Sequence, residues 1–460
     1  MALPLLGLRA VQLSRFVVAF REAAPGEHVL YDVVGDRYVG VDDGLLASIE
    51  RWKSQPPAEG SERETQAALS EMGFLVAGGA ADEERLAEHW RRSAEGMPGT
   101  LYVTWLPTLA CNLACNYCFQ KDHPATGHMS AEAEAATLEY ILRRVEQAGT
   151  PRLVVHYIGG EPLTRKDLVL RSAEALSRAM AARGGSFGWE LTTNGIGLTP
   201  ELVNALLAFG EGKVKVTLDG DKETHDAARV YRSGKGTFDQ VFAAMAAVAK
   251  GCPGVKLRVG GNFVAGQADS YERLLQRMEE AGLRGLVNEI RFKPVVDTDS
   301  AQGACAGCAS AVQEAETLVQ IGRSVQRRGL ARKPLPFVDS AGLCELHWDN
   351  AVVVDPAGRL YKCLEVAGRP EMAIGDVWAG VGRADPLLAG RPWEKHAPCR
   401  TCAYLPVCGG GCLGGRYLQA GHTGEVFCRL ENFEKSFREE IVNRYLAEFH
   451  ADEGKIREAA

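Results

Sequence analysis

The chain has 460 residues, of which 46% are hydrophobic and 24% charged, and this is typical of a globular protein with about two to four domains. Its net charge of −7, from 52 basic and 59 acidic residues, excludes a general attraction to nucleic acid or to an anionic membrane surface. No apolar run approaches the roughly 18 residues of a membrane span, and the start of the chain lacks the basic region of a signal peptide. We therefore expect a cytoplasmic protein without a membrane partner.

The cysteine count is high for a cytoplasmic protein. There are 13 cysteines, and all except Cys252, Cys305 and Cys308 fall in two closely spaced groups. Because thiols stay reduced in the cytosol, clustered cysteines indicate metal or redox ligands rather than disulfides.

Residues 1–95 are expected to form a small α+β unit. Residues 28–34 and 37–41 have the pattern of two strands with a turn between them, and Asp43 is the predicted cap of a following helix. A second helix, which carries Ala67, Leu69 and Met72 and ends at Gly73, and a short strand at 74–76 follow. This order resembles the winged-helix domains that bind leader peptides of ribosomally made peptides. A simple cap on the next domain is the alternative.

Strands and helices alternate over residues 100–300. Strands are predicted at 101–106, 153–158, 189–193, 214–218, 256–264 and 289–294, and helices at 131–148, 168–180, from 200 onward, 238–248 and 271–281. Ser130 is a suitable N-cap for the first of these helices, and Thr199 with Pro200 for the third. About six such units predict an α/β fold, a partial (β/α)6 TIM-like barrel with a parallel sheet.

A loop with three cysteines follows the first predicted barrel strand. Cys111, Cys115 and Cys118 have the spacing C-x3-C-x2-C. A structural zinc site normally needs four protein ligands, and this loop supplies three. A [4Fe–4S] cluster held by three thiolates would leave one iron for a ligand from outside the protein. Buried free cysteines or part of a zinc knuckle are the alternatives.

Residues able to contact a small ligand come directly after three predicted strands, where the chemistry of such barrels is located. They are Gly159, Gly160, Glu161 and Pro162 after the second strand, Thr193 and Asn194 after the third, and Asp219 after the fourth. Glu161 offers a carboxylate to an ammonium group, and Thr193 and Asn194 can form hydrogen bonds with hydroxyl groups. Each signal alone is weak, since glycine and asparagine at a strand end usually mark a turn.

The second cysteine group spans residues 344–428 and forms the predicted C-terminal domain. Its members are Cys344, Cys363, Cys399, Cys402, Cys408, Cys412 and Cys428. Residues 352–361 between the first two are predicted to form a β-hairpin with its turn at 356–358. Seven cysteines at ligand-like spacing indicate bound metal, and zinc in one set of four is the alternative to iron–sulfur clusters.

The three-cysteine loop, followed by these strand-end residues in this order, resembles the radical S-adenosylmethionine (radical SAM) enzymes. The resemblance implies a [4Fe–4S] cluster on Cys111, Cys115 and Cys118, with SAM at its open iron. It implies that Glu161 holds the SAM amino group and that Thr193 and Asn194 lie near the ribose and carboxylate. Tyr117 would lie near the adenine, and Gly159, Gly160, Pro162 and Asp219 would complete the cofactor-binding set. No catalytic residue is identified.

Residues 344–430 resemble the SPASM domain, which carries two auxiliary [4Fe–4S] clusters in radical SAM maturases. The resemblance places Cys344, Cys363 and Cys412 on the nearer cluster, and Cys399, Cys402, Cys408 and Cys428 on the farther one. Seven ligands are one short of two complete sites. Either the nearer cluster has an open iron, or Cys305 or Cys308 supplies the eighth ligand from the bridging region 301–343. The region 431–460 would follow, with a helix that docks on the barrel and a polar, frayed tail over 451–460.

The chain also resembles the subset of radical SAM enzymes that modify peptides and proteins. The segments that carry this resemblance are 216–220, His225, Arg229 and 234–239. A phosphate loop at 233–237 is excluded, because glycine follows the lysine and the upstream glycine is missing. The resemblance implies a maturase in which a 5′-deoxyadenosyl radical takes hydrogen from a ribosomally made precursor peptide. The product would be a thioether, C–C or C–O crosslink, or an epimer. The implied partners are the precursor peptide, with its leader on the N-terminal unit, and flavodoxin or ferredoxin as electron donor.

The sequence leaves three other functions open. An anaerobic sulfatase-type formylglycine maturase would have Asp after the cysteine that matches Cys363, and here Leu364 and Glu365 follow it. A radical SAM enzyme could instead act on a small molecule, in which case the N-terminal unit would bind no peptide. A zinc-binding adaptor would contain zinc and no iron.

Overall fold

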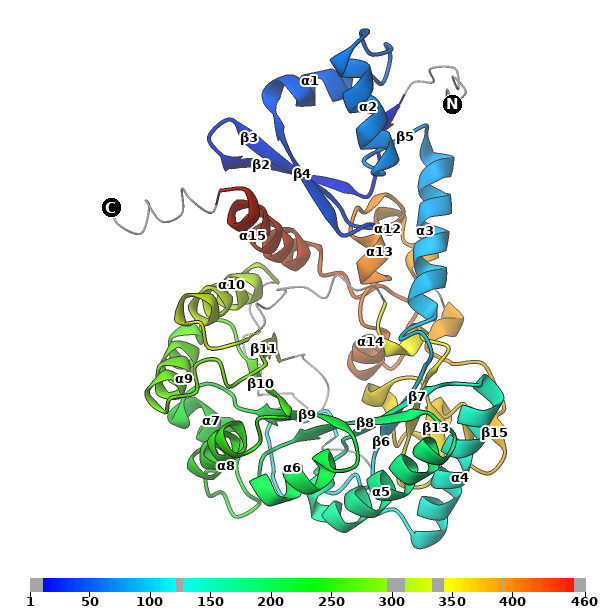
Figure 1. The fold of residues 1–460 in the computed structure, drawn as a ribbon, viewed down its shortest axis with the longest axis vertical. Coiled ribbons are helices and arrows are strands. Elements are labelled where there is room, and N and C mark those ends of the chain that lie inside the picture. The colour runs from blue at the N-terminus through cyan, green and yellow to red at the C-terminus, as the bar shows by residue number, and fades with distance from the viewer. Residues whose placement is uncertain (1–10, 121–126, 296–310, 333–342, 391, 451–460) are drawn as a thin grey trace.

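The computed structural model describes residues 11–120, 127–295, 311–332, 343–390 and 392–450. Figure 1 shows a small N-terminal unit at one end, a curved sheet surrounded by helices at the other, and the C-terminal elements between and beside them. None of the helices in these residue ranges has the length and apolar character needed to cross a membrane.

The N-terminal unit contains a three-stranded antiparallel sheet in the order β2-β3-β4, and a separate pair of β1 with β5. Its elements are β1 (Gln12–Leu13), β2 (Val17–Ala24), β3 (Glu27–Asp32), β4 (Arg37–Asp42), α1 (Asp43–Arg51), α2 (Ser61–Glu71), β5 (Leu75–Val76) and α3 (Gly79–Ala94). The predicted strands and helices are present, whereas β1, β2 and α3 were not predicted. The predicted cap was wrong by one residue, because it is Asp42 whose carboxylate accepts a hydrogen bond from the Leu45 backbone at 2.7 Å.

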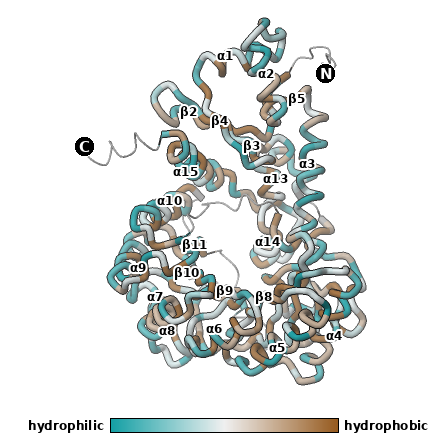
Figure 2. The backbone as a smooth tube through the Cα atoms, in the orientation of Figure 1, coloured by the Kyte–Doolittle hydropathy of each residue, from teal (hydrophilic) through white to brown (hydrophobic). Residues whose placement is uncertain are grey.

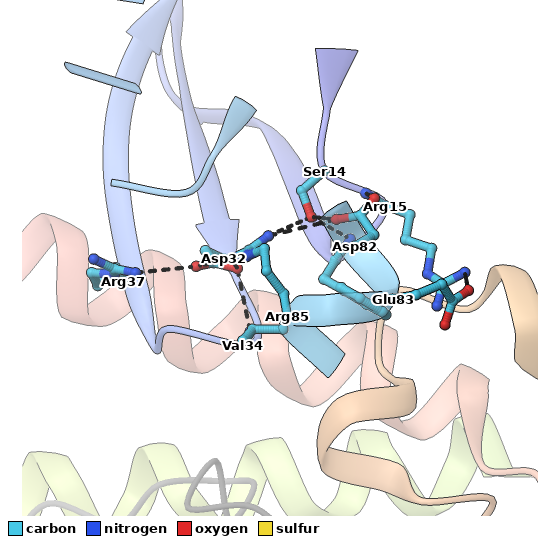
Figure 3. A network of polar contacts seen from close by, with 9 residues as sticks. Ser14, Arg15, Asp32, Val34, Arg37, Asp82, Glu83 and Arg85 are labelled. Atoms are coloured by element: carbon cyan, nitrogen blue, oxygen red, sulfur yellow. Dashed lines mark hydrogen bonds and ion pairs between the residues drawn. The ribbon is translucent and has the colours of Figure 1, made fainter. Parts of the chain in front are cut away.

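A buried ion-pair network attaches α3 to this sheet (Figure 3). The Arg85 guanidinium donates to both carboxylate oxygens of Asp32, at 2.7 and 2.8 Å, and to the Ser14 hydroxyl at 2.6 Å. Ser14 in turn donates to Asp82 at 2.6 Å. Asp32 is fully buried, and burial raises the pKa of its carboxyl while Arg85 opposes that rise. Arg85 is therefore the main counter-charge that allows a carboxylate to be buried there, and Arg37 adds a weaker ion pair at 3.7 Å.

The barrel is built from parallel strands in the order β11-β10-β9-β8-β7-β6. Its strands are β6 (Thr100–Trp105), β7 (Arg152–Tyr157), β8 (Ser186–Thr193), β9 (Glu211–Thr217), β10 (Lys256–Phe263) and β11 (Glu289–Pro294). Its helices are α4 (Ala131–Ala148), the short η1 (Pro162–Arg165), α5 (Lys166–Ala182), α6 (Pro200–Leu207), α7 (Lys222–Ala228), α8 (Phe238–Gly251) and α9 (Ala268–Glu280). The predicted α/β class with a partial barrel is confirmed.

Local sequence signals account for several helix boundaries. The Ser130 hydroxyl accepts from the Ala133 backbone at 3.1 Å and begins α4, which ends at Gly149 in the left-handed conformation with φ +58°. Thr199 caps α6 in the same way, with Pro200 in its first turn. α7 was not predicted, because its seven residues are too few to show a helical period.

Alternate residues of the strands face the surrounding helices and form the main core. This core includes Trp105, Val155, Trp189, Val216 and Val259, all almost fully buried. Figure 2 shows hydrophobic segments along β8 and β9, whereas α3 is mainly hydrophilic. The hydrophobic effect therefore fixes the barrel strands and leaves their carboxyl ends for polar residues.

The C-terminal cysteine-rich region extends the barrel sheet. β12 (Ala351–Val354) lies parallel to β6, and the predicted hairpin joins it to β13 (Arg359–Tyr361). β14 (Gly375–Asp376) and β15 (Gly380–Val381) complete a sheet of ten strands among the residues described. The remaining helices are α10 (Ala311–Arg328), η3 (Glu345–His347), η4 (Leu364–Val366), η5 (Pro370–Met372), η6 (Leu388–Gly390), α11 (Pro392–Lys395), α12 (Ala397–Thr401), α13 (Leu405–Cys408), α14 (Leu413–Ala420) and α15 (Leu430–Phe449).

Helix α15 connects the barrel to the N-terminal unit. On one side Arg323 of α10 forms an ion pair with Glu439 of α15. On the other, Phe437 packs 5.8 Å from the ring of Tyr31 in β3, measured between centroids. α15 therefore lies on the barrel through α10, as expected, and also covers the N-terminal sheet (Figure 1).

Candidate functional site

The three-cysteine loop follows β6 at the carboxyl end of the barrel strands. Cys111, Cys115 and Cys118 lie close enough to influence one another's ionisation. Burial raises the pKa of Cys111, and it raises the pKa of Cys115 to about 11, while the nearby Arg229 lowers both. Such thiols stay protonated at neutral pH unless a metal centre holds them as thiolates.

Glu161 lies at the end of β7 with only 1% of its surface exposed. Its Oε1 accepts from the Leu163 backbone at 2.9 Å and from the Thr193 hydroxyl at 2.8 Å, and its Oε2 accepts from the Asn194 backbone at 2.7 Å. Burial raises the pKa of Glu161 to about 7 although these hydrogen bonds oppose the rise. A cation beside this carboxylate would stabilise its charged form.

Asn194 joins the carboxylate to the cysteine loop. Its side-chain amide donates to Asn112 Oδ1 at 2.7 Å and lies 3.8 Å from the sulfur of Cys111. Since its backbone amide binds Glu161, one residue spans both features. The sequence placed Glu161, Thr193 and Asn194 at strand ends, and the structure brings them together beside Cys111.

Two glycines allow the chain after β7 to pass directly under the cysteine loop. A Cβ atom at Gly159 would lie 2.2 Å from the Thr108 carbonyl oxygen, and one at Gly160 would lie 2.2 Å from that of Ala110. Gly159 also has φ +146°, which side chains disfavour. Pro162 follows as the first residue of η1, whose start is capped by Glu161. The glycines therefore set the distance between this loop and the carboxylate.

Tyr117, in the cysteine loop, is the centre of a second polar cluster. Its hydroxyl donates to Asp219 and accepts from Arg229 at 2.6 Å and from the Asn262 side chain at 3.2 Å. The Arg229 guanidinium also lies 3.7 Å from Asp219. The cluster ties the cysteine loop to the ends of β9 and β10. Asn262 was missed from the sequence, although its place near the end of a strand is the signal that could have found it.

His225 and Thr237 support this cluster from behind. His225 is fully buried, accepts from the Asp219 backbone through Nδ1 at 3.2 Å and contacts the Thr237 hydroxyl through Nε2 at 3.0 Å. Thr237 donates to the Arg229 carbonyl at 2.7 Å. Burial lowers the pKa of His225 to about 4, so it is neutral. Its contacts are those of a residue that positions Asp219 and Arg229.

A cavity of about 500 Å³ opens beside Tyr117. It lies between the ends of β9 and β10 and the helices α7 and α9, and its lining includes Tyr117, Asp219, Asn262 and Gln267. These side chains offer hydrogen-bond donors and acceptors next to the cysteine loop.

The C-terminal cysteines fall into two spatial groups. In the first, burial, the Glu365 carboxylate and the thiols of Cys412 and Cys344 raise the pKa of Cys363. α14 packs tightly here, since a Cβ atom at Gly414 would lie 2.7 Å from the sulfur of Cys363. The structure thus brings Cys344, Cys363 and Cys412 together. Cys305 and Cys308 lie outside the described residues.

The second group contains Cys399, Cys402, Cys408 and Cys428. Burial raises the pKa of Cys408 to about 12, and the thiols of Cys402 and Cys399 add to the rise. Burial and the thiols of Cys402 and Cys428 raise that of Cys399.

Across the described ranges, no three His, Cys, Asp or Glu side chains lie close enough to hold a single metal ion. A four-iron cluster bonds each thiolate to a different iron, so its cysteines need not converge on one point. The donor set fits a cluster and SAM, because three neighbouring thiols lie beside a buried carboxylate able to receive an ammonium group.

Comparison with known proteins finds a radical SAM domain in this chain. Residues 105–281 match the model of the radical SAM superfamily. The chain is 27% identical over 360 residues to mycofactocin maturase MftC of Mycobacterium tuberculosis, covering 73% of this chain and 83% of the relative. It is 29% identical over 321 residues to PqqA peptide cyclase of Ruegeria pomeroyi, covering 66% and 80%. It is 25% identical over 357 residues to Fe-coproporphyrin III synthase of Methanosarcina barkeri, covering 67% and 82%.

Solved structures share the fold at low sequence identity. Native anSMEcpe with bound AdoMet and Cp18Cys peptide has a TM-score of 0.60 at 17% identity, covering 75% of this chain and 99% of that one. Streptococcus suis SuiB bound to precursor peptide SuiA has a TM-score of 0.51 at 13% identity, covering 91% and 99%. The solved structures show a shared fold, and the domain match together with the similar relatives indicates a radical SAM enzyme.

Proposed function

We propose that the chain is a peptide maturase whose SAM-binding cluster is held by Cys111, Cys115 and Cys118. The observation that carries the site is the contact of Asn194 with both Cys111 and Glu161. A thiol loop beside an isolated buried carboxylate suits a cluster whose outside ligand carries an ammonium group. Glu161 receives that ammonium group, and Thr193 and Asn194 hold the Glu161 carboxylate in place through hydrogen bonds.

The cavity beside Tyr117 receives the nucleoside part of SAM. It adjoins the cysteine loop and offers Asp219, Asn262 and Gln267 as hydrogen-bonding partners. When bound, the cluster and SAM supply a 5′-deoxyadenosyl radical that takes a hydrogen atom from the substrate. The protein holds both groups and keeps competing reactants away.

The two C-terminal cysteine groups hold two auxiliary [4Fe–4S] clusters, as in a SPASM domain. The support is their spatial grouping into Cys344, Cys363 and Cys412 and into four further cysteines. Three thiols in the first group leave one position for a substrate thiolate or an eighth protein ligand. Clusters held by these cysteines would supply electron transfer for the reaction, and the proposed electron donor to the cluster on Cys111, Cys115 and Cys118 is flavodoxin or ferredoxin.

The substrate is a ribosomally made peptide, as the names of two similar proteins and the peptide complexes of two structural neighbours suggest. The N-terminal sheet has β2 and β4 as its edge strands among the described residues. An extended leader peptide can add to such an edge through backbone hydrogen bonds. The product is a crosslink or an epimer.

Anaerobic purification followed by iron, sulfide and SAM-cleavage assays tests this function. We expect about twelve irons per chain, which corresponds to three four-iron clusters. A Cys111→Ser, Cys115→Ser, Cys118→Ser triple variant should retain about eight and release no 5′-deoxyadenosine. Zinc without iron, or a triple variant with the full iron content, would contradict the proposal.

A radical SAM enzyme acting on a small molecule is the second candidate, because one similar protein is named as a coproporphyrin synthase. Assaying SAM cleavage with the short peptides encoded beside the gene separates the two. Stimulation of 5′-deoxyadenosine release and a mass change of the peptide support the maturase. Release stimulated by a small molecule alone would favour the second candidate.

A further inference from the structure

A short segment after α7 holds the three-cysteine loop in place. The Ala114 backbone amide donates to the Val230 carbonyl at 2.8 Å, and the Asn116 amide donates to the Ala228 carbonyl at 3.2 Å. The two segments therefore form an isolated antiparallel β-bridge, with Leu113 opposite Tyr231, although more than 100 residues separate them in the sequence. Arg229 lies between the two accepting residues.

The side chain of Arg229 enters the interior instead of solvent. Only 7% of its surface is exposed, and its Nη1 donates to the Tyr117 hydroxyl at 2.6 Å. Asp219 lies 3.7 Å from the same nitrogen, and its other carboxylate oxygen accepts from the Asn262 backbone at 2.7 Å. The buried Nε of Arg229 has no hydrogen-bond partner. Burying this guanidinium beside the loop that carries Tyr117 therefore costs folding free energy, because a charged group with one unpaired donor is removed from water.

An arginine keeps its charge at every accessible pH, so this position carries a permanent cation. Asp219 offsets part of that charge, but it shares its carboxylate with Tyr117 and the Asn262 backbone. The guanidinium also lies near the thiols of Cys111 and Cys115, where it acts on their ionisation. Its field therefore reaches the cluster position assigned in the proposed function, on which this inference rests.

We propose that Arg229 is a positioning residue whose fixed charge raises the reduction potential of the SAM-binding cluster. Reduction adds one electron, so the reduced centre carries one more negative charge than the oxidised one. A buried cation favours the reduced form, because charge interactions are weakly screened away from water. Tyr117, Asp219 and the pairing of residues 228–230 with the loop keep the guanidinium at a constant place.

Potentiometric titration with dithionite, followed by electron paramagnetic resonance, tests this charge effect. Arg229→Met removes the charge at similar side-chain length, and Arg229→Lys keeps it. In the Met variant, the equilibrium constant for reduction of the cluster should fall at least tenfold. For one electron this is a shift of about 59 mV to more negative potential. The reduction potential of the Lys variant should differ from that of the wild type by less than half of that shift. Arg178→Met, an exposed arginine on α5, is the matched control and should not change the potential.

The other outcomes are also decisive. A Met variant with wild-type potential, or Met and Lys variants with equal shifts, would overturn the proposal. If the Met variant does not assemble the cluster, Asp219→Asn replaces it, since this change keeps the guanidinium and removes the carboxylate that offsets its charge. A potential more positive than that of the wild type in Asp219→Asn supports the charge effect, and an unchanged or more negative potential overturns it. The iron content of the wild-type protein tests the proposed function separately.

Discussion

The affinity for SAM is expected to depend on pH through Glu161. Its burial raises the pKa to about 7, so in the free enzyme the carboxyl is protonated below that pH and ionised above it. About one-tenth of the molecules carry the charged form at pH 6 and about half at pH 7. Only the charged form attracts an ammonium group. The apparent Kd should therefore fall about fivefold between pH 6 and pH 7, equal to about 1 kcal/mol of binding free energy.

Isothermal titration calorimetry of the anaerobic, cluster-loaded enzyme with SAM measures this change of Kd with pH, which is called the slope below. The amino group of SAM stays protonated over the range, since an α-amino group titrates near roughly 7.7–8.0. Glu161→Gln should weaken binding at pH 7 and remove the slope, whereas Glu139→Gln, an exposed carboxyl on α4, should keep it. The Gln amide would oppose the Asn194 N–H, so iron content confirms that the variant retains its cluster. A Kd that is constant from pH 6 to pH 7, or a Gln variant with the wild-type slope, would refute the role of Glu161.

Three further predictions address other parts of the chain. Cys344→Ser should lower the iron content by about four atoms, as the loss of one cluster requires, whereas Cys252→Ser, a buried core position, should leave it unchanged. Gly160→Ala should weaken SAM binding at least about tenfold, because its Cβ atom would lie 2.2 Å from a loop carbonyl; Gly79→Ala, with open space around it, is the calorimetric control. Arg85→Met removes the two-point partner of the buried Asp32 carboxylate and leaves only the weaker Arg37 pair at 3.7 Å, so it should destabilise the N-terminal unit by up to about 3–5 kcal/mol, measured by hydrogen exchange; equal protection in both proteins would contradict this.

Features encoded by neighbouring residues were predictable from the sequence. Ser130 and Thr199 lie directly before apolar helical repeats, and the parallel strands have continuous apolar runs. The three-cysteine loop and Glu161 were found because their spacing and strand-end positions are local properties. The structure adds that Asn194 joins them.

Features that depend on contacts between distant segments could not be predicted. No local pattern shows that Asn262 reaches Tyr117, or that His225 faces Asp219 rather than solvent. The pairing of β12 with β6 was also missed, because a short apolar strand is compatible with many partners. The register between strands that are distant in sequence depends on tertiary packing.

The pairing of β12 with β6 also affects how the protein is synthesised. Tyr102 and its partner Ala351 are 249 residues apart, so β6 leaves the ribosome long before the strand that covers its outer edge. At about 5–20 residues per second, that edge stays open for roughly 12–50 s in each nascent chain. An open edge beside an apolar sheet is a site for incorrect pairing between chains. Slow translation or truncation before residue 351 should therefore favour aggregation, and expression yield will depend on keeping the C-terminal region attached.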